Sequence, residues 1–166
     1  DAANRAQIGH TDFLQRPDIG TKIDLMRCER VAVTVAIDEG PKHRPERIKT
    51  RAERAGNGFR LSGSTSFVVH GGSADMLVVA ARTSGADDDA DGITLFAVPK
   101  SAAGLSQDAV RLVDRAIATH VTLADVGLDG DAVIGDVDGG RALLNRVLAA
   151  GRIGAAAESV GVARGS

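Results

Sequence analysis

The sequence is poor in aromatic residues and in cysteine. Its 166 residues include four Phe and one Cys, with neither Tyr nor Trp. The single Cys28 cannot form an internal disulfide, which is typical of a protein from a reducing compartment and predicts a cytoplasmic location. The chain also shows neither a charged-then-apolar leader nor an apolar run of about 20 residues, so secretion and membrane insertion are not expected.

An excess of positive charge is also missing. Twenty Lys and Arg residues meet 22 Asp and Glu residues, and the predicted isoelectric point is near 6.1. A surface that neutralises phosphates usually requires a visible basic excess, and stacking on bases requires aromatic side chains. Nucleic-acid binding is therefore not expected.

The side chains that bind metals or act as nucleophiles are not clustered. The four histidines lie far apart without a Cys or paired acid at ligand spacing, so no metal site is predicted. The serines lack the strand-to-helix elbow of a serine hydrolase. Three aspartates at 87–89 lack the remaining pattern of a calcium loop, and they are interpreted as a solvated tip. The histidines are His10, His43, His70 and His120.

Short β-branched segments separated by turn residues dominate the middle of the chain. A first strand is expected over 30–37, and the stretch 48–99 repeats a strand-and-turn unit. Gly56, Asn57 and Gly58 predict a tight hairpin. Two continuous apolar strands, 76–81 and 93–98, are expected to be buried on both faces. This pattern predicts a mainly β protein built as an antiparallel β-barrel.

Three further segments complete the predicted organisation. Residues 110–113 and 120–126 are weaker strand candidates, the second as a half-buried edge. Asp138 is a candidate N-cap for a long amphipathic helix over 139–163, whose apolar stripe has no following helix to pack against. Residues 1–30 form a short N-terminal segment that no pattern assigns. We therefore expect an N-terminal remnant of a helical domain (1–30), a barrel domain (31–137) and the first helix of a truncated helical domain (138–166).

Four stretches, in order, resemble the acyl-CoA dehydrogenase family. Residues 37–40 are similar to the end of the family's first barrel strand. Residues 50–63 resemble its hairpin with a Gly-aromatic pair and a closing Gly, and 66–75 resemble its flavin strand with the Gly and Ala-Asp that follow. Residues 139–161 are similar to the first helix of its C-terminal bundle. The resemblance covers residues 31–163.

This resemblance implies the middle domain of a flavoprotein. One wall of the barrel would pack against the ring of FAD and help to shape the site for an acyl-CoA substrate, whose α,β-desaturation is the family reaction. A flat apolar side chain favours contact with a ring system, and backbone groups at strand ends can tune the flavin. The flavin-contacting residues implied by position are Ile37, Asp38, Glu39, Phe67, Val68 and Val69.

Several features depart from the family pattern. Asp38 and Val69 replace the hydroxyl residues of the two strands, and the carboxylate of Asp38 would oppose flavin reduction. The catalytic base, usually supplied by the C-terminal helices, cannot be named among these residues. Self-association through helical regions is expected, while the electron acceptor is unknown. The basic loop 42–49 is either a contact for CoA phosphates or a solvated loop.

Two alternatives to a dehydrogenase remain at this point. The same fold could carry an FAD-dependent monooxygenase, since the hydroxyl groups expected at 38 and 69 are absent. The chain could also be a non-catalytic barrel module whose C-terminal helix serves only in assembly. Composition does not separate these functions.

Overall fold

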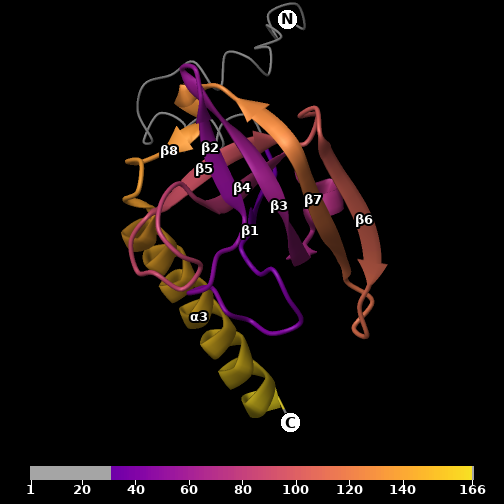
Figure 1. The fold of residues 1–166 in the computed structure, drawn as a ribbon. Coiled ribbons are helices and arrows are strands. Elements are labelled where there is room, and N and C mark those ends of the chain that lie inside the picture. The colour runs from indigo at the N-terminus through magenta and orange to yellow at the C-terminus, as the bar shows by residue number, and fades with distance from the viewer. Residues whose placement is uncertain (1–30, 166) are drawn as a thin grey trace, which may run out of the picture.

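The computed structural model describes residues 31–165, which form one sheet and one long helix (Figure 1). The predicted N-terminal segment 1–30 lies outside the described residues. Two short 3-10 turns, η1 (Gly71–Ser73) and η2 (Gly130–Ala132), connect strands. The other elements are β1 (Val33–Ala36), β2 (Arg51–Ala55), β3 (Gly58–Val69), β4 (Met76–Arg82), β5 (Ile93–Pro99), β6 (Leu105–Arg111), β7 (Ile117–Leu128), β8 (Val133–Ile134) and α3 (Gly140–Gly165).

The sheet has the order β6-β7-β3-β2-β4-β5-β8, and β1 pairs with β4 beside this path. Neighbouring strands are mostly antiparallel, but β1 and β2 both run parallel to β4. Among the described residues, β6 and β8 at the two ends of the order do not pair with each other. The mainly β prediction is therefore confirmed, whereas closure of the sheet into an antiparallel barrel is not.

The strands β4 and β5 contribute side chains to two hydrophobic clusters, one on each face of the sheet. Alternate side chains of a strand point to opposite faces, so a strand that is apolar throughout can serve both. The first cluster joins these strands to β2, β3 and β7, and includes Leu77, Val79, Phe96, Val98, Leu61 and Val121. The second joins them to α3, and includes Ala80, Ile93, Leu95, Ile48 and Leu144. The prediction that both strands are buried on both faces is confirmed.

The predicted hairpin is present, and the remaining strands differ in detail from the expectation. Gly56 adopts the left-handed φ of 59° that the turn between β2 and β3 requires, and Ala55 pairs with Gly58. The strand β7 pairs with both β3 and β6. It is therefore an interior strand, not the edge predicted for 120–126. The edge is β6, which shares only its last two residues with the predicted strand 110–113, because the rest of its sequence is too polar to distinguish it from a loop.

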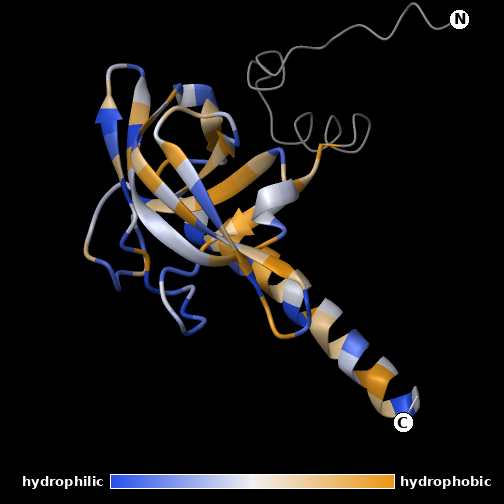
Figure 2. Ribbon diagram, turned by 90° about the vertical axis from the view of Figure 1, so that its right-hand side faces the viewer, coloured by the Kyte–Doolittle hydropathy of each residue, from blue (hydrophilic) through white to orange (hydrophobic). Residues whose placement is uncertain are grey.

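The helix α3 matches the predicted span closely, but only its start packs on the sheet. Leu144 is buried, whereas Ile153 is 72% exposed. Figure 1 shows the helix starting beside the sheet and running away from it to the C-terminus, and Figure 2 shows hydrophobic and hydrophilic residues interspersed along the projecting part. Among residues 31–165, no helix is both long and apolar enough to cross a membrane.

Asp138 does not cap α3 in the expected way. The helix begins at Gly140, and Asp138 has a left-handed φ of 63°. Its carboxylate accepts hydrogen bonds from the hydroxyls of Thr83 and Ser84, at 2.6 and 2.9 Å. Asp138 therefore joins the approach to α3 to the two residues that follow β4.

Candidate functional site

The end of β1 and the end of β3 meet, although about 30 residues separate them in the sequence. The backbone N–H of Ser66 donates to the carbonyl of Asp38 at 2.5 Å. The hydroxyl of Thr34 donates to the carbonyl of Val69 at 2.8 Å. The structure thus brings together the two segments that the sequence predicts to face the flavin.

A β-bulge shapes the end of β3 at this meeting point. Thr65 pairs with Val121, and Val68 pairs with Thr119, so Ser66 and Phe67 on β3 stand opposite His120 alone on β7. Phe67 has a left-handed φ of 55°, a strained conformation for a large side chain. The residue is 44% exposed. Bulges near functional sites commonly redirect a side chain, and here the redirected side chain is aromatic.

The six residues predicted to contact flavin divide into three groups. Ile37 and Val68 are buried, one in each hydrophobic cluster. Asp38 and Glu39 point their carboxylates into the loop that follows them. Phe67 and Val69, by contrast, are large apolar residues that remain 44% and 47% exposed. Of the six residues, only Phe67 and Val69 expose a large apolar side chain at the end of β3.

The carboxylates of Asp38 and Glu39 hold the loop 40–50. Asp38 accepts from His43 Nδ1 at 2.8 Å and from the backbone N–H of Arg44 at 3.0 Å. Glu39 accepts from the backbone N–H groups of Lys49 and Thr50, at 2.7 and 2.5 Å. The negative charge of Asp38 is therefore partnered within the loop, as a turn-forming acid would be.

A basic pocket of about 340 Å³ lies over this loop. Its lining contains four cationic side chains and the single carboxylate of Glu39. Arg47 forms an exposed ion pair with Asp88 at 3.3 Å. Within residues 31–165, the side chains of Lys42, Arg44 and Lys49 have no ion-pair partner. The pocket therefore presents uncompensated positive charge to solvent. The lining is Glu39, Gly40, Pro41, Lys42, Arg44, Arg47 and Lys49.

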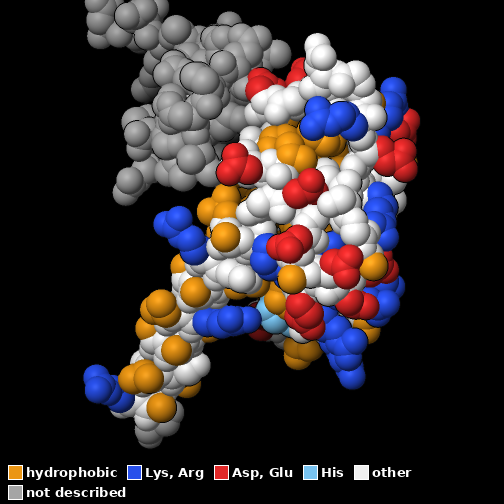
Figure 3. Space-filling view, turned by 60° about the vertical axis from the view of Figure 1, so that its left-hand side comes forward, with side chains coloured by type: hydrophobic (Ala, Val, Ile, Leu, Met, Phe, Trp, Pro, Cys, Tyr) orange, Lys and Arg blue, Asp and Glu red, His pale blue; other side chains and the backbone are white. Residues whose placement is uncertain are grey.

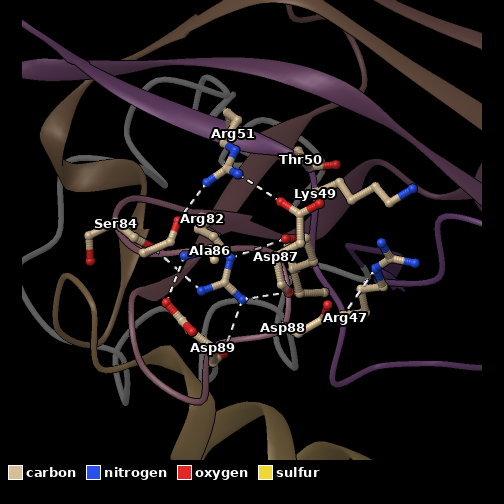
Figure 4. Close-up of polar contacts among 12 residues, drawn as sticks. Arg47, Lys49, Thr50, Arg51, Arg82, Ser84, Ala86, Asp87, Asp88 and Asp89 are labelled. Carbon is tan, nitrogen blue, oxygen red and sulfur yellow. Dashed lines mark hydrogen bonds and ion pairs between the residues drawn. The ribbon is translucent and has the colours of Figure 1, made fainter.

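One buried arginine organises the acidic loop beside this pocket (Figure 4). Arg82, at the end of β4, is 1% exposed. Its Nε donates to the carbonyl of Ile48 at 3.1 Å. Its two Nη atoms donate to carbonyls of the loop, namely those of Ser84, Asp87, Asp89 and Asp91, at 2.8 to 3.4 Å. Burial lowers the pKa of Arg82, and the negative charge of Asp89 opposes that shift.

Two more arginines complete what we call the arginine brace, formed by Arg51, Arg82 and Arg141. Arg51 donates to the carboxylate of Asp87 at 2.7 Å and to a backbone carbonyl of the loop. Arg141, in the first turn of α3, donates to the carbonyls of Pro45, Glu46, Asp89 and Ala90 at 3.0 to 3.2 Å. The brace therefore ties together the acidic loop, the basic loop and the start of the helix.

Asp88 and Asp89 are exposed to solvent, as the interpretation of 87–89 as a solvated tip expects, but the loop is also held by hydrogen bonds. Asp87 pairs with Arg51, and Asp89 accepts from the backbone N–H of Ala86 at 2.7 Å. Sequence reasoning missed the brace because most of its acceptors are backbone carbonyls, which no sequence pattern displays. The one available signal was a charged residue, Arg82, directly after an apolar strand.

An apolar groove of about 330 Å³ lies between the end of β1 and α3. It is lined by Val35, Ile37, His43, Val147, Leu148, Gly151, Arg152 and Ala155. Figure 3 shows hydrophobic side chains continuing along the projecting helix beyond the sheet. His43, a residue of the loop 40–50, lines this groove and also contacts the carboxylate of Asp38. Among residues 31–165, no three His, Cys, Asp or Glu side chains gather as metal ligands would.

Comparison with known proteins agrees with this architecture. The sequence profile of the acyl-CoA dehydrogenase middle domain matches residues 39–126, which include the basic loop, the bulge and the arginines of β2 and β4. This match covers more than half of the chain. The protein therefore belongs to the acyl-CoA dehydrogenase family, and the resemblance seen in the sequence is confirmed.

Three relatives show how much of a family member this chain represents. Cyclohex-1-ene-1-carbonyl-CoA dehydrogenase of Geobacter metallireducens is 30% identical over 122 residues, which are 72% of this chain and 32% of that protein. Glutaryl-CoA dehydrogenase of Mycobacterium smegmatis superposes with a TM-score of 0.62 and 25% identity, over 76% of this chain and 33% of that one. The Tcur3481-Tcur3483 steroid ACAD superposes with a TM-score of 0.70 and 24% identity, over 75% and 33%. The chain thus spans about a third of each relative.

Proposed function

We propose that this chain forms the flavin-facing part of an FAD-dependent oxidoreductase that desaturates an acyl-CoA thioester between its α and β carbons. The observation that carries the proposal is the exposed apolar face formed by Phe67 and Val69 where β3 meets the end of β1. These residues lie in the segment that matches the family's middle domain. A bound flavin would supply the electron-accepting ring for this reaction.

The residues present at this face fit a flavin ring. Phe67 exposes a flat apolar ring to water, which is unfavourable. Contact with another flat ring would remove this apolar surface from water. The carboxylate of Asp38 accepts hydrogen bonds from His43 and from a backbone N–H, so a carboxylate without hydrogen-bond partners does not face the site. We propose that Phe67 and Val69 contact the ring with their side chains, while 37–39 and Val68 contribute backbone groups.

The experiment that tests this function uses the full-length protein. Purified protein is expected to show flavin absorbance, which anaerobic addition of a suitable acyl-CoA should bleach. The relative from Geobacter is named for a ring-bearing acyl group, so the panel should contain cyclic as well as straight-chain thioesters. Protein without flavin would refute the assignment, and bound flavin that no thioester bleaches would refute the desaturation.

We also propose that the basic pocket receives the phosphates of CoA. Lys42, Arg44 and Lys49 lack ion-pair partners among the described residues, and their positive charge attracts an anionic ligand. The double variant Lys42→Ala/Arg44→Ala should weaken thioester binding about 2- to 5-fold for each charge removed. The same charge loss in Arg111→Ala/Arg146→Ala, outside the pocket, serves as the control. Equal effects of both variants would show that only net charge matters.

We further propose that the chain comprises parts of two domains. Residues 31–137 would form the flavin-facing domain, and 138–166 the first helix of a helical domain. The exposed residues Ile153, Val160 and Val162 support this view, because burial against other helices would remove their apolar surface from water. Slower amide exchange of α3 in the full-length protein than in the isolated 166-residue chain would support it. Equal exchange would contradict it.

A further inference from the structure

The bulge at Phe67 has a single residue opposite it, and that residue touches the ring that the bulge redirects. On β3, Ser66 and Phe67 occupy the space between two regular pairs, and on β7 only His120 does. The rings of Phe67 and His120 meet edge to face, with centroids 5.3 Å apart and planes at 63°. Edge-to-face contact at this separation is a favourable geometry for aromatic pairs.

The backbone of the bulge is also held from the other side. The N–H of Ser66 donates to the carbonyl of Asp38, at the end of β1. This hydrogen bond provides an acceptor for a backbone N–H within the bulge. It also anchors the bulge to 37–39, the first of the two segments predicted to contact flavin. A strained backbone conformation persists only where surrounding contacts hold it in place. Here the contacts come from the end of β1 on one side and from β7 on the other.

Phe67 differs from the other residues with positive φ. Non-glycine residues with positive φ in the described part are Phe67, His70, Arg115, Asp125 and Asp138. Histidine and aspartate tolerate this conformation better than most residues, and Arg115 lies in the turn between β6 and β7. Phe67 is the large aromatic residue that adopts it inside a strand. Relaxation of this backbone would move the ring away from its present direction.

We propose that His120 is a positioning residue for Phe67. Its imidazole ring holds the strained phenyl ring in the outward direction, and thereby sets the position of the aromatic surface that faces the flavin. This inference rests on the proposed function for its consequence at the flavin. The contact between the two rings, by contrast, can be tested without any cofactor.

The first test uses the full-length protein free of flavin. The ring current of Phe67 should displace the imidazole C–H resonances of His120 in NMR spectra, and Phe67→Leu should remove that displacement. Unchanged His120 resonances in Phe67→Leu would overturn the proposal. The result does not depend on flavin, so it decides the ring contact even if the proposed function fails.

The second test uses the flavin-loaded protein. His120→Ala should raise the Kd for flavin, by up to about tenfold, and shift its visible absorption bands, because Phe67 loses its lateral contact. His120→Phe, which retains a ring, should restore both. His70→Asn is the matched control, since it changes a histidine near the end of β3 that has no ring contact with Phe67.

The outcomes separate the two claims. Wild-type protein that binds no flavin refutes the proposed function, and the NMR comparison then decides the role of His120 alone. Bound flavin with the same Kd and spectrum in His120→Ala overturns the positioning role. An effect that His120→Phe does not restore also overturns it, because a positioning ring should be replaceable by another ring.

Discussion

The arginine brace and the bulge at Phe67 lie on the same sheet and are built in opposite ways. In the brace, the donors of Arg82 reach backbone carbonyls, and the guanidinium is almost completely buried. At the bulge, a large apolar ring is exposed and its backbone is strained. Satisfied polar contacts and burial stabilise a fold, whereas exposed apolar surface and strain do not. The contrast separates a region that maintains the structure from one that is available for a ligand.

Among the variants that test this contrast, removal of the buried guanidinium of Arg82 should cause the largest loss of stability. Arg82→Met keeps an unbranched stem but leaves the buried carbonyl of Ile48 and four part-buried carbonyls of the loop without donors, so the free energy of unfolding should fall by about 3 kcal/mol or more. Urea denaturation measures this loss. Arg82→Lys should fall between wild type and Arg82→Met, since lysine keeps the charge with fewer donors. A loss under about 1 kcal/mol for Arg82→Met would show that the loop does not depend on this residue.

Removal of Arg141 should have an intermediate effect. Arg141→Ala breaks the bonds between the start of α3 and the two loops, which are more exposed than those of Arg82. Stability should decrease by about 1–2 kcal/mol, and amide exchange in 84–91 should become faster. Arg146→Ala, on the exposed side of the same helix, should change stability by less than about 0.5 kcal/mol. Similar losses for both variants would place the effect in the helix and not in the brace.

Replacement of Phe67 should have a small effect on stability, despite the size of the side chain. In Phe67→Asn, the lost ring contact is offset by relief of the left-handed strain, because Asn tolerates this conformation, which costs about 1 kcal/mol in most residues that carry a Cβ. Stability should therefore change by less than about 1 kcal/mol, while flavin binding weakens. The buried Phe59→Ala should lose about 3–5 kcal/mol. A loss of that size in Phe67→Asn would mean that Phe67 serves the core.

The smallest change in stability is expected at Val69. Val69→Thr keeps the β-branched shape on a half-exposed position, so stability should remain within about 0.5 kcal/mol of wild type. The new hydroxyl restores the residue type that the family resemblance implies at this position. Flavin affinity, measured by fluorescence titration, should then stay equal or increase. A weaker affinity would contradict this expectation and would show that the contact with the ring requires both methyl groups of Val69.

The sequence predicted well those features that depend on neighbours along the chain. The hairpin at 56–58, the doubly buried strands β4 and β5 and the span of α3 follow from turn residues and from periodicity. Through the family resemblance it also predicted Phe67 and Val69 as flavin contacts, which stays a prediction; both residues are exposed. The sequence wrongly predicted β7 to be an edge strand. A half-apolar strand shows the same alternation of residues whether it lies at the edge of a sheet or beside a polar strand such as β6.

The sequence by itself therefore determined the mainly β class of the fold and the family. Only the tertiary structure decided that the sheet is not closed through its end strands, that Arg82 and Arg141 bind one loop, and that His120 faces the bulge. The physical reason is that side-chain periodicity is local. Carbonyl acceptors and strand register, in contrast, depend on segments that are distant in the chain and become neighbours only on folding.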